Sequence, residues 1–125
     1  MRSFLVDTHA FLWFLDGDSS LSITARGLIA DPTNQVLVSV ASLWEAAIKR
    51  GLGKLALPDD FPDLLETAGF ETLAVEAEDA WSVADLPQHH GDPFDRLLIA
   101  QASNRGIPII TGDPRFAAYE VELRW

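Results

Sequence analysis

Short apolar segments alternate with helical segments along most of this chain, and the alternation limits the fold more than any other sequence feature. The apolar segments, which we interpret as strands, cover residues 4–6, 36–40, 71–75, 107–110 and 121–123. The segments with helical character cover residues 9–15, 22–30, 42–50, 59–69, 78–86 and 93–105. Strands that alternate with helices are typical of α/β proteins with a parallel sheet. We therefore predict an α/β sandwich with a mainly parallel central sheet of about four to five strands.

The length and composition suit one domain with a buried core. The chain has 125 residues, of which 48% are hydrophobic, so we predict a single domain over residues 1–125. It contains no cysteine, which excludes disulfides, thiolate metal sites and thiol nucleophiles. No apolar run approaches the ~20 residues that span a bilayer, and no small-residue cleavage site follows the apolar N-terminal segment. We expect a soluble, cytoplasmic protein with no membrane partner.

The charge is strongly negative but unevenly distributed. Nine Lys and Arg against 19 Asp and Glu give a net charge of −10, which by itself argues against a nucleic-acid partner. Nine of the acids lie between residues 59 and 85, where there is no Lys or Arg, so the rest of the chain is nearly neutral. Lys49, Arg50 and Lys54 lie close together and form a candidate basic lip that contacts a substrate. A solvated helix end, where the helix dipole favours positive charge, is the alternative.

Four acids follow predicted strands or begin a predicted helix. Asp7 and Asp113 each come after an apolar strand segment, and Glu45 lies in the first turn of the helix after another. Asp95 lies in the first turn of the helix over residues 93–105 and can face the same cleft. Open α/β sheets form their sites at the carboxyl ends of the strands. We therefore expect these four acids to meet at one edge of the sheet.

Each acid also has a purely structural explanation. Ser42 and Glu45 have the spacing of a helix capping box, and Glu45 can pair with Lys49 one turn later. Asp92 can cap the following helix and place Asp95 near its positive end. Taken singly, each acid is better explained by such a role. Four caps need not fall on one sheet edge, so together the acids favour a shared site.

Coulomb's law decides what such a site requires. At ~5 Å and an effective dielectric of ~20, each pair of carboxylates repels by about 3 kcal/mol, or roughly 20 kcal/mol for all pairs among four. That exceeds the ~5 to 15 kcal/mol stability of a typical domain. Either some carboxyls are protonated or divalent cations neutralise them, and oxygen ligands suit Mg²⁺ or Mn²⁺. Such a metal activates water and stabilises charge on a phosphodiester, so the acids indicate nuclease chemistry.

The segments that carry these acids resemble a known family. They are FLVDTHAFLW (4–13), SLWEAAIKRG (42–51), DPFDRLLIAQA (92–102) and IITGDPRF (109–116). In order and position they resemble the acidic motifs of PIN-domain ribonucleases, specifically the VapC toxins of bacterial toxin–antitoxin pairs, and DPFDRLLIAQA is the most specific. The resemblance implies a PIN-like α/β/α sandwich and Mg²⁺- or Mn²⁺-dependent endoribonuclease activity on RNA. It also implies a homodimer and a cognate VapB-like antitoxin.

The resemblance assigns roles to particular residues. It makes Asp7, Glu45, Asp95 and Asp113 the catalytic and metal-binding acids. We expect the three aspartates to hold the metal and Glu45 to complete the site and orient the attacking water.

Three further positions belong to the same motifs. Thr111 stands at the hydroxyl position two residues before the last acid, and Asp92 is an additional supporting acid. The family often has a polar or basic residue where Gly112 stands here, and this departure argues against a substrate contact from that position.

The adjacent His89 and His90 suggest zinc, but neighbouring side chains rarely aim at one ion and no third soft ligand lies nearby in sequence. We interpret them as a loop pair near the cleft mouth. His9 can reach the edge of the site or have a structural role.

The first helical segment is apolar on all sides. Thr8 is its expected cap, and every residue from 10 to 15 is apolar, including Phe11 and Trp13. A helix that is apolar all round needs cover on both sides, either within the domain or under a partner. For a VapC-like protein the partner would be the antitoxin, with Phe11 and Trp13 as its contacts.

Two other functions are alternatives to a nuclease. A receiver-like signalling module shares the length and the alternation of strands and helices. It needs paired acids after the first strand and a Lys after a late strand, but the late strand segment IPIITGD (107–113) contains no Lys. A PIN scaffold that binds RNA without cleaving it is the second alternative, and the presence of all four acids argues against it.

Overall fold

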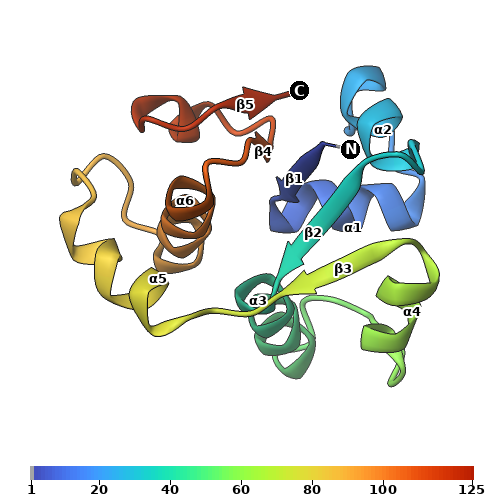
Figure 1. The fold of residues 1–125 in the computed structure, drawn as a ribbon. Helices are drawn as coiled ribbons and strands as arrows, with labels where there is room; N and C mark the ends of the chain where they lie inside the picture. The colour runs from blue at the N-terminus through green and yellow to red at the C-terminus, as the bar shows by residue number, and fades with distance from the viewer. Residues whose placement is uncertain (1) are drawn as a thin grey trace.

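A five-stranded parallel sheet forms the centre of the computed structural model, which describes residues 2–125 (Figure 1). Across the sheet the strands are β3 (Phe70–Leu73), β2 (Gln35–Ser39), β1 (Ser3–Val6), β4 (Ile109–Ile110) and β5 (Leu123–Arg124). Each strand runs parallel to its neighbours. The prediction of a mainly parallel sheet of four to five strands is confirmed.

The strand order places a reversal at the centre of the sheet. The chain moves outward from β1 through β2 to β3, then returns to the other side of β1 with β4 and β5. Leu5 of β1 is therefore opposite Leu37 of β2 on one side and Ile109 of β4 on the other. Such a reversal opens a crevice at the carboxyl ends of β1 and β4.

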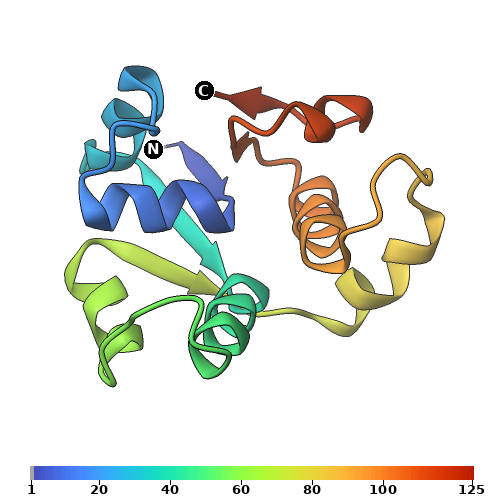
Figure 2. The ribbon, with the colours of Figure 1, turned by 180° about the vertical axis from the view of Figure 1, so that it is seen from behind.

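Helices cover both faces of this sheet (Figures 1 and 2). The helices are α1 (Thr8–Asp16), α2 (Ile23–Ala30), α3 (Val40–Gly51), α4 (Phe61–Thr67), α5 (Ala77–Ser82) and α6 (Pro93–Arg105), with 3₁₀ turns η1 (Val83–Asp85) and η2 (Pro114–Ala118). Several ends follow the predicted capping residues: Ser22 caps α2 and Asp92 caps α6 through their side chains, while Gly106 ends α6 at φ 65°. Among residues 2–125, no helix is both long and apolar enough to cross a membrane.

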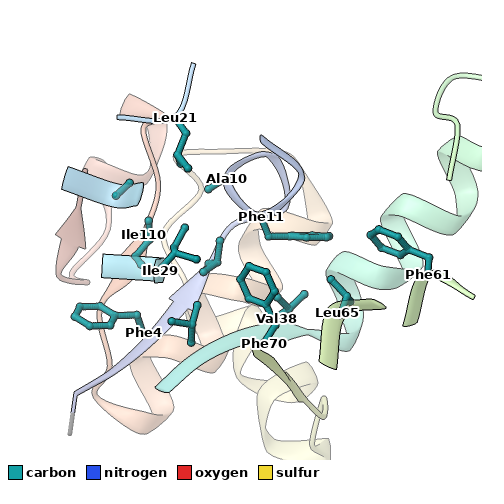
Figure 3. Packing of buried hydrophobic residues seen from close by; sticks show 13 residues of the cluster. Phe4, Ala10, Phe11, Leu21, Ile29, Val38, Phe61, Leu65, Phe70 and Ile110 are labelled. Carbon is teal, nitrogen blue, oxygen red and sulfur yellow. The ribbon is translucent and has the colours of Figure 1, made fainter. Parts of the chain in front are cut away.

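The larger half of the core lies between the sheet and the helices α1, α2 and α4. It contains Phe4 and Val6 of β1 with Phe11 of α1 (Figure 3). The Phe11 ring lies 6.2 Å from the Phe61 ring and 6.4 Å from the Phe70 ring. Because alternate residues of a strand point to opposite faces, Leu5 joins the other half of the core, under α6 and η2. The α/β/α arrangement follows from this division.

The start of α3 differs from the prediction. The expected strand over 36–40 ends at Ser39, whose side chain accepts a hydrogen bond from the Ala41 N–H and caps the helix. Ser42 is therefore buried inside the helix, where its hydroxyl accepts a hydrogen bond from Thr8 at 3.0 Å. The capping-box explanation of Ser42 and Glu45 is wrong. Glu45 lies one turn further into the helix than expected.

Candidate metal centre

Asp7 lies directly after β1 and is nearly fully buried. Its Oδ1 accepts a hydrogen bond from the Ala10 N–H at 2.7 Å, so Asp7, and not Thr8, caps α1. Its Oδ2 accepts a hydrogen bond from the hydroxyl of Thr111, which follows β4. Two adjacent strands therefore fix the orientation of this carboxyl.

Burial changes the acidity of Asp7. It raises the pKa from 3.8 to about 6, because the ionised carboxylate loses hydration, and the charge of Asp95 adds to this effect. The hydrogen bonds from Thr111 and Ala10 act in the opposite direction. Without a cation, Asp7 therefore ionises near pH 6, whereas a bound dication would favour the carboxylate at lower pH.

Asp113 lies two residues after Thr111 and faces the same pocket as Asp7. Its backbone N–H donates to Thr111 Oγ1 at 3.1 Å. Arg115 forms an ion pair with it at 2.7 Å, and this contact holds the pKa of Asp113 below its usual value. Asp113 is therefore ionised, and Arg115 contacts both of its carboxylate oxygens.

Asp95 is brought to the site by α6. Asp92 caps this helix, and its Oδ1 accepts the N–H groups of Phe94 and Asp95 at 2.8 and 3.0 Å. Burial raises the pKa of Asp95, a contact with His90 lowers it, and the charges of Asp92 and Glu45 raise it further. Asp92 thus acts through capping and charge.

His90 is a site residue that sequence reasoning did not assign. Its Nε2 lies 2.7 Å from Asp95 Oδ2, and its ring is buried. The Tyr119 hydroxyl accepts a hydrogen bond from the His90 N–H, which anchors the loop before α6. His89, its neighbour, is exposed. The histidine doublet beside the DPFD motif was the available sequence signal, but only one member turns inward.

Glu45 lies in α3 and is buried. Its Oε2 pairs with Lys49 Nζ at 3.3 Å, as the spacing predicts. Its Oε1 is buried and finds no hydrogen-bond partner among residues 2–125. A buried carboxylate oxygen without a partner is costly, so a ligand that supplies positive charge would be favourable there. The negative charge of Glu45 raises the pKa of Asp95, so the two acids interact electrostatically.

The side chains present fit a divalent cation. His90, Asp95 and Asp113 offer ligand atoms that all lie within 4.8 Å of one another. Glu45 adds a buried oxygen without a hydrogen-bond partner among residues 2–125, and burial of Asp7 disfavours its carboxylate form unless a cation lies nearby. A donor set dominated by carboxylates suits Mg²⁺ or Mn²⁺, with the imidazole of His90 either ligating or orienting Asp95.

The basic lip is largely occupied by local contacts. Lys49 pairs with Glu45, and Arg50 donates to the Leu57 carbonyl at 2.9 Å and pairs with Asp59. These contacts favour the alternative interpretation, a helix end that is closed by its own ion pairs.

The two expected partner contacts on α1 have different environments. Phe11 is fully buried between the sheet and α4, so the prediction that it contacts a partner is corrected: it is a core residue. Trp13 is only partly buried and lines the pocket that contains Asp7 and Asp113.

The model of the PIN domain matches residues 4–122, and the chain therefore belongs to the PIN-domain family. Within that family it is similar to a VapC protein, being 38% identical over 55 residues to Ribonuclease VapC16 of Mycobacterium tuberculosis. The match covers 41% of this chain and 39% of that relative, or about two fifths of each. Family membership overturns the receiver-like interpretation.

Solved toxin–antitoxin proteins share the fold over nearly the whole chain. VapBC2 from Rickettsia felis, bound to a promoter DNA fragment, gives a TM-score of 0.73 at 15% identity and 99% coverage of both chains. VapBC-5 from M. tuberculosis gives 0.60 at 26% identity and 98% coverage of both. M. tuberculosis VapC20, a sarcin-ricin loop cleaving toxin, gives 0.63 at 23% identity, with 98% of this chain and 99% of that one covered.

Proposed function

We propose that this chain is a Mg²⁺- or Mn²⁺-dependent endoribonuclease and the toxin of a VapBC-type toxin–antitoxin pair. The observation that carries the proposal is the buried Glu45 Oε1, unpartnered within residues 2–125, on an acid whose charge raises the pKa of Asp95 in the group of His90, Asp95 and Asp113. The PIN family and the similarity to a VapC ribonuclease support hydrolysis of RNA as the reaction.

Each residue of the site has a separate role in this proposal. Asp7, Asp95 and Asp113 would hold the ion, which would lower the pKa of a bound water and neutralise charge on the phosphate. The free Oε1 of Glu45 accepts a hydrogen bond from the attacking water and orients it. Thr111 keeps Asp7 in place through their hydrogen bond.

Cleavage of RNA by the purified protein tests this function. We expect single-stranded RNA of mixed sequence to be cut in Mn²⁺ and left intact in EDTA, and sequencing of the new ends gives the cleaved positions. Asp95→Asn should abolish cleavage. Asp63→Asn, an exposed acid in α4, is the matched control and should cleave normally. Cleavage that persists in EDTA or in Asp95→Asn contradicts the proposal.

The proposed partner is a VapB-like antitoxin. The VapBC assemblies that share this fold support a partner of this type. Trp13 is the aromatic residue that we expect the antitoxin to contact, because it is partly exposed beside the acids. Trp13→Ala should weaken the complex, as measured by calorimetry with a purified VapB-like antitoxin; unchanged affinity removes this contact.

We also propose a homodimer through α3. Exposed apolar side chains recur every four residues along this helix and at its C-terminal cap; they are Val40, Trp44, Ile48 and the cap residue Leu52. This apolar stripe can pack against the same stripe of a second subunit about a twofold axis. Trp44→Asp should convert a dimer to a monomer in light scattering, whereas Trp81→Asp should not. A wild-type monomer at high concentration contradicts this proposal.

A further inference from the structure

A pocket of about 410 Å³ adjoins the metal centre and has aromatic walls. Its volume lies within the roughly 300–1,000 Å³ that is usual for small-ligand sites. The residues that matter here are Asp7, His9, Trp13, Gly112, Asp113 and Trp125. One pocket therefore contains two of the metal-centre acids and three planar side chains.

The rings form one continuous wall. His9 and Trp13 lie one helical turn apart on α1, with ring centroids separated by 5.8 Å and planes inclined by 31°. Trp125, which follows β5, lies 6.2 Å from Trp13 at 58°. Trp125 is 38% exposed and lines the pocket, so part of its surface is open to a ligand. Two elements that are far apart in sequence thus build a single stacking surface.

Gly112 allows Trp125 to take this position. A Cβ atom at residue 112 would lie 2.5 to 2.9 Å from three atoms of the indole, which is too close for any side chain. The indole therefore covers the loop that joins Thr111 to Asp113. It holds the aromatic wall directly against the acids.

The charges around the acids determine how RNA can be held. Two basic side chains that contact these acids are held in ion pairs, Lys49 with Glu45 and Arg115 with Asp113. The usual contacts of free Lys and Arg with phosphates are therefore weak near this site. Stacking of bases on aromatic rings is the other main source of affinity for single strands, and it needs no positive charge.

We propose that this pocket binds the base of a nucleotide adjoining the cleaved phosphate of single-stranded RNA, with Trp125 and Trp13 as its stacking surface. The proposal rests on the proposed ribonuclease function. A base stacked there lies beside Asp7 and Asp113, so its own backbone reaches the metal centre. Trp13 and Trp125 are thus positioning residues that set where the RNA is cut.

The proposal is tested by combining changes in the protein with changes in the RNA substrate. The substrates are a short RNA that the wild type cuts at one phosphate, and two copies that lack the base on the 5′ or the 3′ side of it. Trp125→Ala should raise KM on intact RNA by roughly 5- to 150-fold, the range for one stacked base, with kcat nearly unchanged. The wild type should show the same loss on one abasic RNA. The variant should show no further loss on that RNA.

Three variants separate stacking from general damage. Trp125→Phe should restore most of the affinity, because a phenyl ring also stacks. Gly112→Ala should reproduce the Trp125→Ala effect, since its methyl group displaces the indole. Trp81→Ala is the matched control, because this tryptophan is 85% exposed on α5 and does not line the pocket.

The outcomes distinguish this proposal from the ribonuclease function. If Trp125→Ala keeps KM within about twofold of wild type, or remains sensitive to the missing base, the base pocket is overturned and the surface is left to a protein partner. If the wild type cuts no RNA in Mn²⁺, the ribonuclease function fails. Binding of the same fluorescent RNAs in Ca²⁺ then tests the pocket: a preference for intact RNA that Trp125→Ala abolishes supports it, and equal binding of all the RNAs overturns it.

Discussion

The hydroxyl of Thr111 donates to Asp7 Oδ2 and, at the same oxygen, accepts the backbone N–H of Asp113. One side chain therefore ties the acid after β1 to the acid after β4. Because the two strands are neighbours only through the sheet order, this contact joins residues that are 104 positions apart in the chain.

Removal of this hydroxyl should weaken metal binding. Thr111→Val keeps the shape of the side chain but removes the hydrogen bond that lowers the pKa of Asp7, so the carboxylate form becomes less favourable. A hydrogen bond to a charged group contributes about 1.5–3 kcal/mol, which corresponds to a Kd for Mn²⁺ raised by roughly tenfold or more. Titration calorimetry at pH 7 measures this change. Thr111→Ser should restore the affinity; equal Kd values for all three proteins contradict the role.

Asp7→Asn should stabilise the metal-free protein while it abolishes cleavage. The pKa of Asp7 rises from 3.8 to about 6 on folding, which corresponds to about 3 kcal/mol of lost stability once the group is ionised. This loss is absent below pH 3.8, grows between pH 3.8 and 6, and is complete above pH 6. Urea unfolding in EDTA should therefore show a more stable variant at pH 8 and a smaller difference near pH 4. A variant less stable than wild type at pH 8 contradicts the assignment.

His90 should affect metal affinity through Asp95. Its imidazole fixes the carboxyl at 2.7 Å, and partners of this kind typically change metal affinity 10- to 100-fold when they are removed. His90→Ala should raise the Kd for Mn²⁺ within roughly that range and lower cleavage in parallel. His89→Ala changes the exposed neighbour and should leave both unchanged. Circular dichroism of each variant separates this effect from unfolding.

Asp79 should contribute to stability away from the site. Arg105 contacts both of its carboxylate oxygens at 2.7 and 2.9 Å, and this contact lowers the pKa of Asp79 to about 2. The stabilisation is therefore present above the unfolded value of 3.8 and is lost as the pH falls toward 2. Asp79→Asn should lose about 2–3 kcal/mol at pH 7 in urea unfolding, with a much smaller loss near pH 2. Asp85→Asn, an exposed acid, is the control.

The sequence alone predicts features whose determinants lie within a few residues of one another. Ser22, Asp92 and Gly106 mark helix ends because caps act on backbone groups two to four residues away. The alternation of strands and helices also predicts the parallel sheet, because each strand or helix is recognised from a short stretch of sequence. The boundary at Ser39 was missed because Ser39 and Ser42 are both acceptable caps, and burial of Ser42 against Thr8 decided between them.

Contacts between distant segments depended on the sheet order and on packing. The reversal at β1 brings Asp7 to Thr111, and the fold of the loop before α6 turns His90 toward Asp95 while His89 faces solvent. Phe11 and Trp13 carry the same apolar signal, but helix periodicity places Phe11 in the core and leaves Trp13 at the pocket. Amino-acid order encodes local hydrogen bonding and periodicity, whereas the distance between remote side chains exists only once the layers have packed.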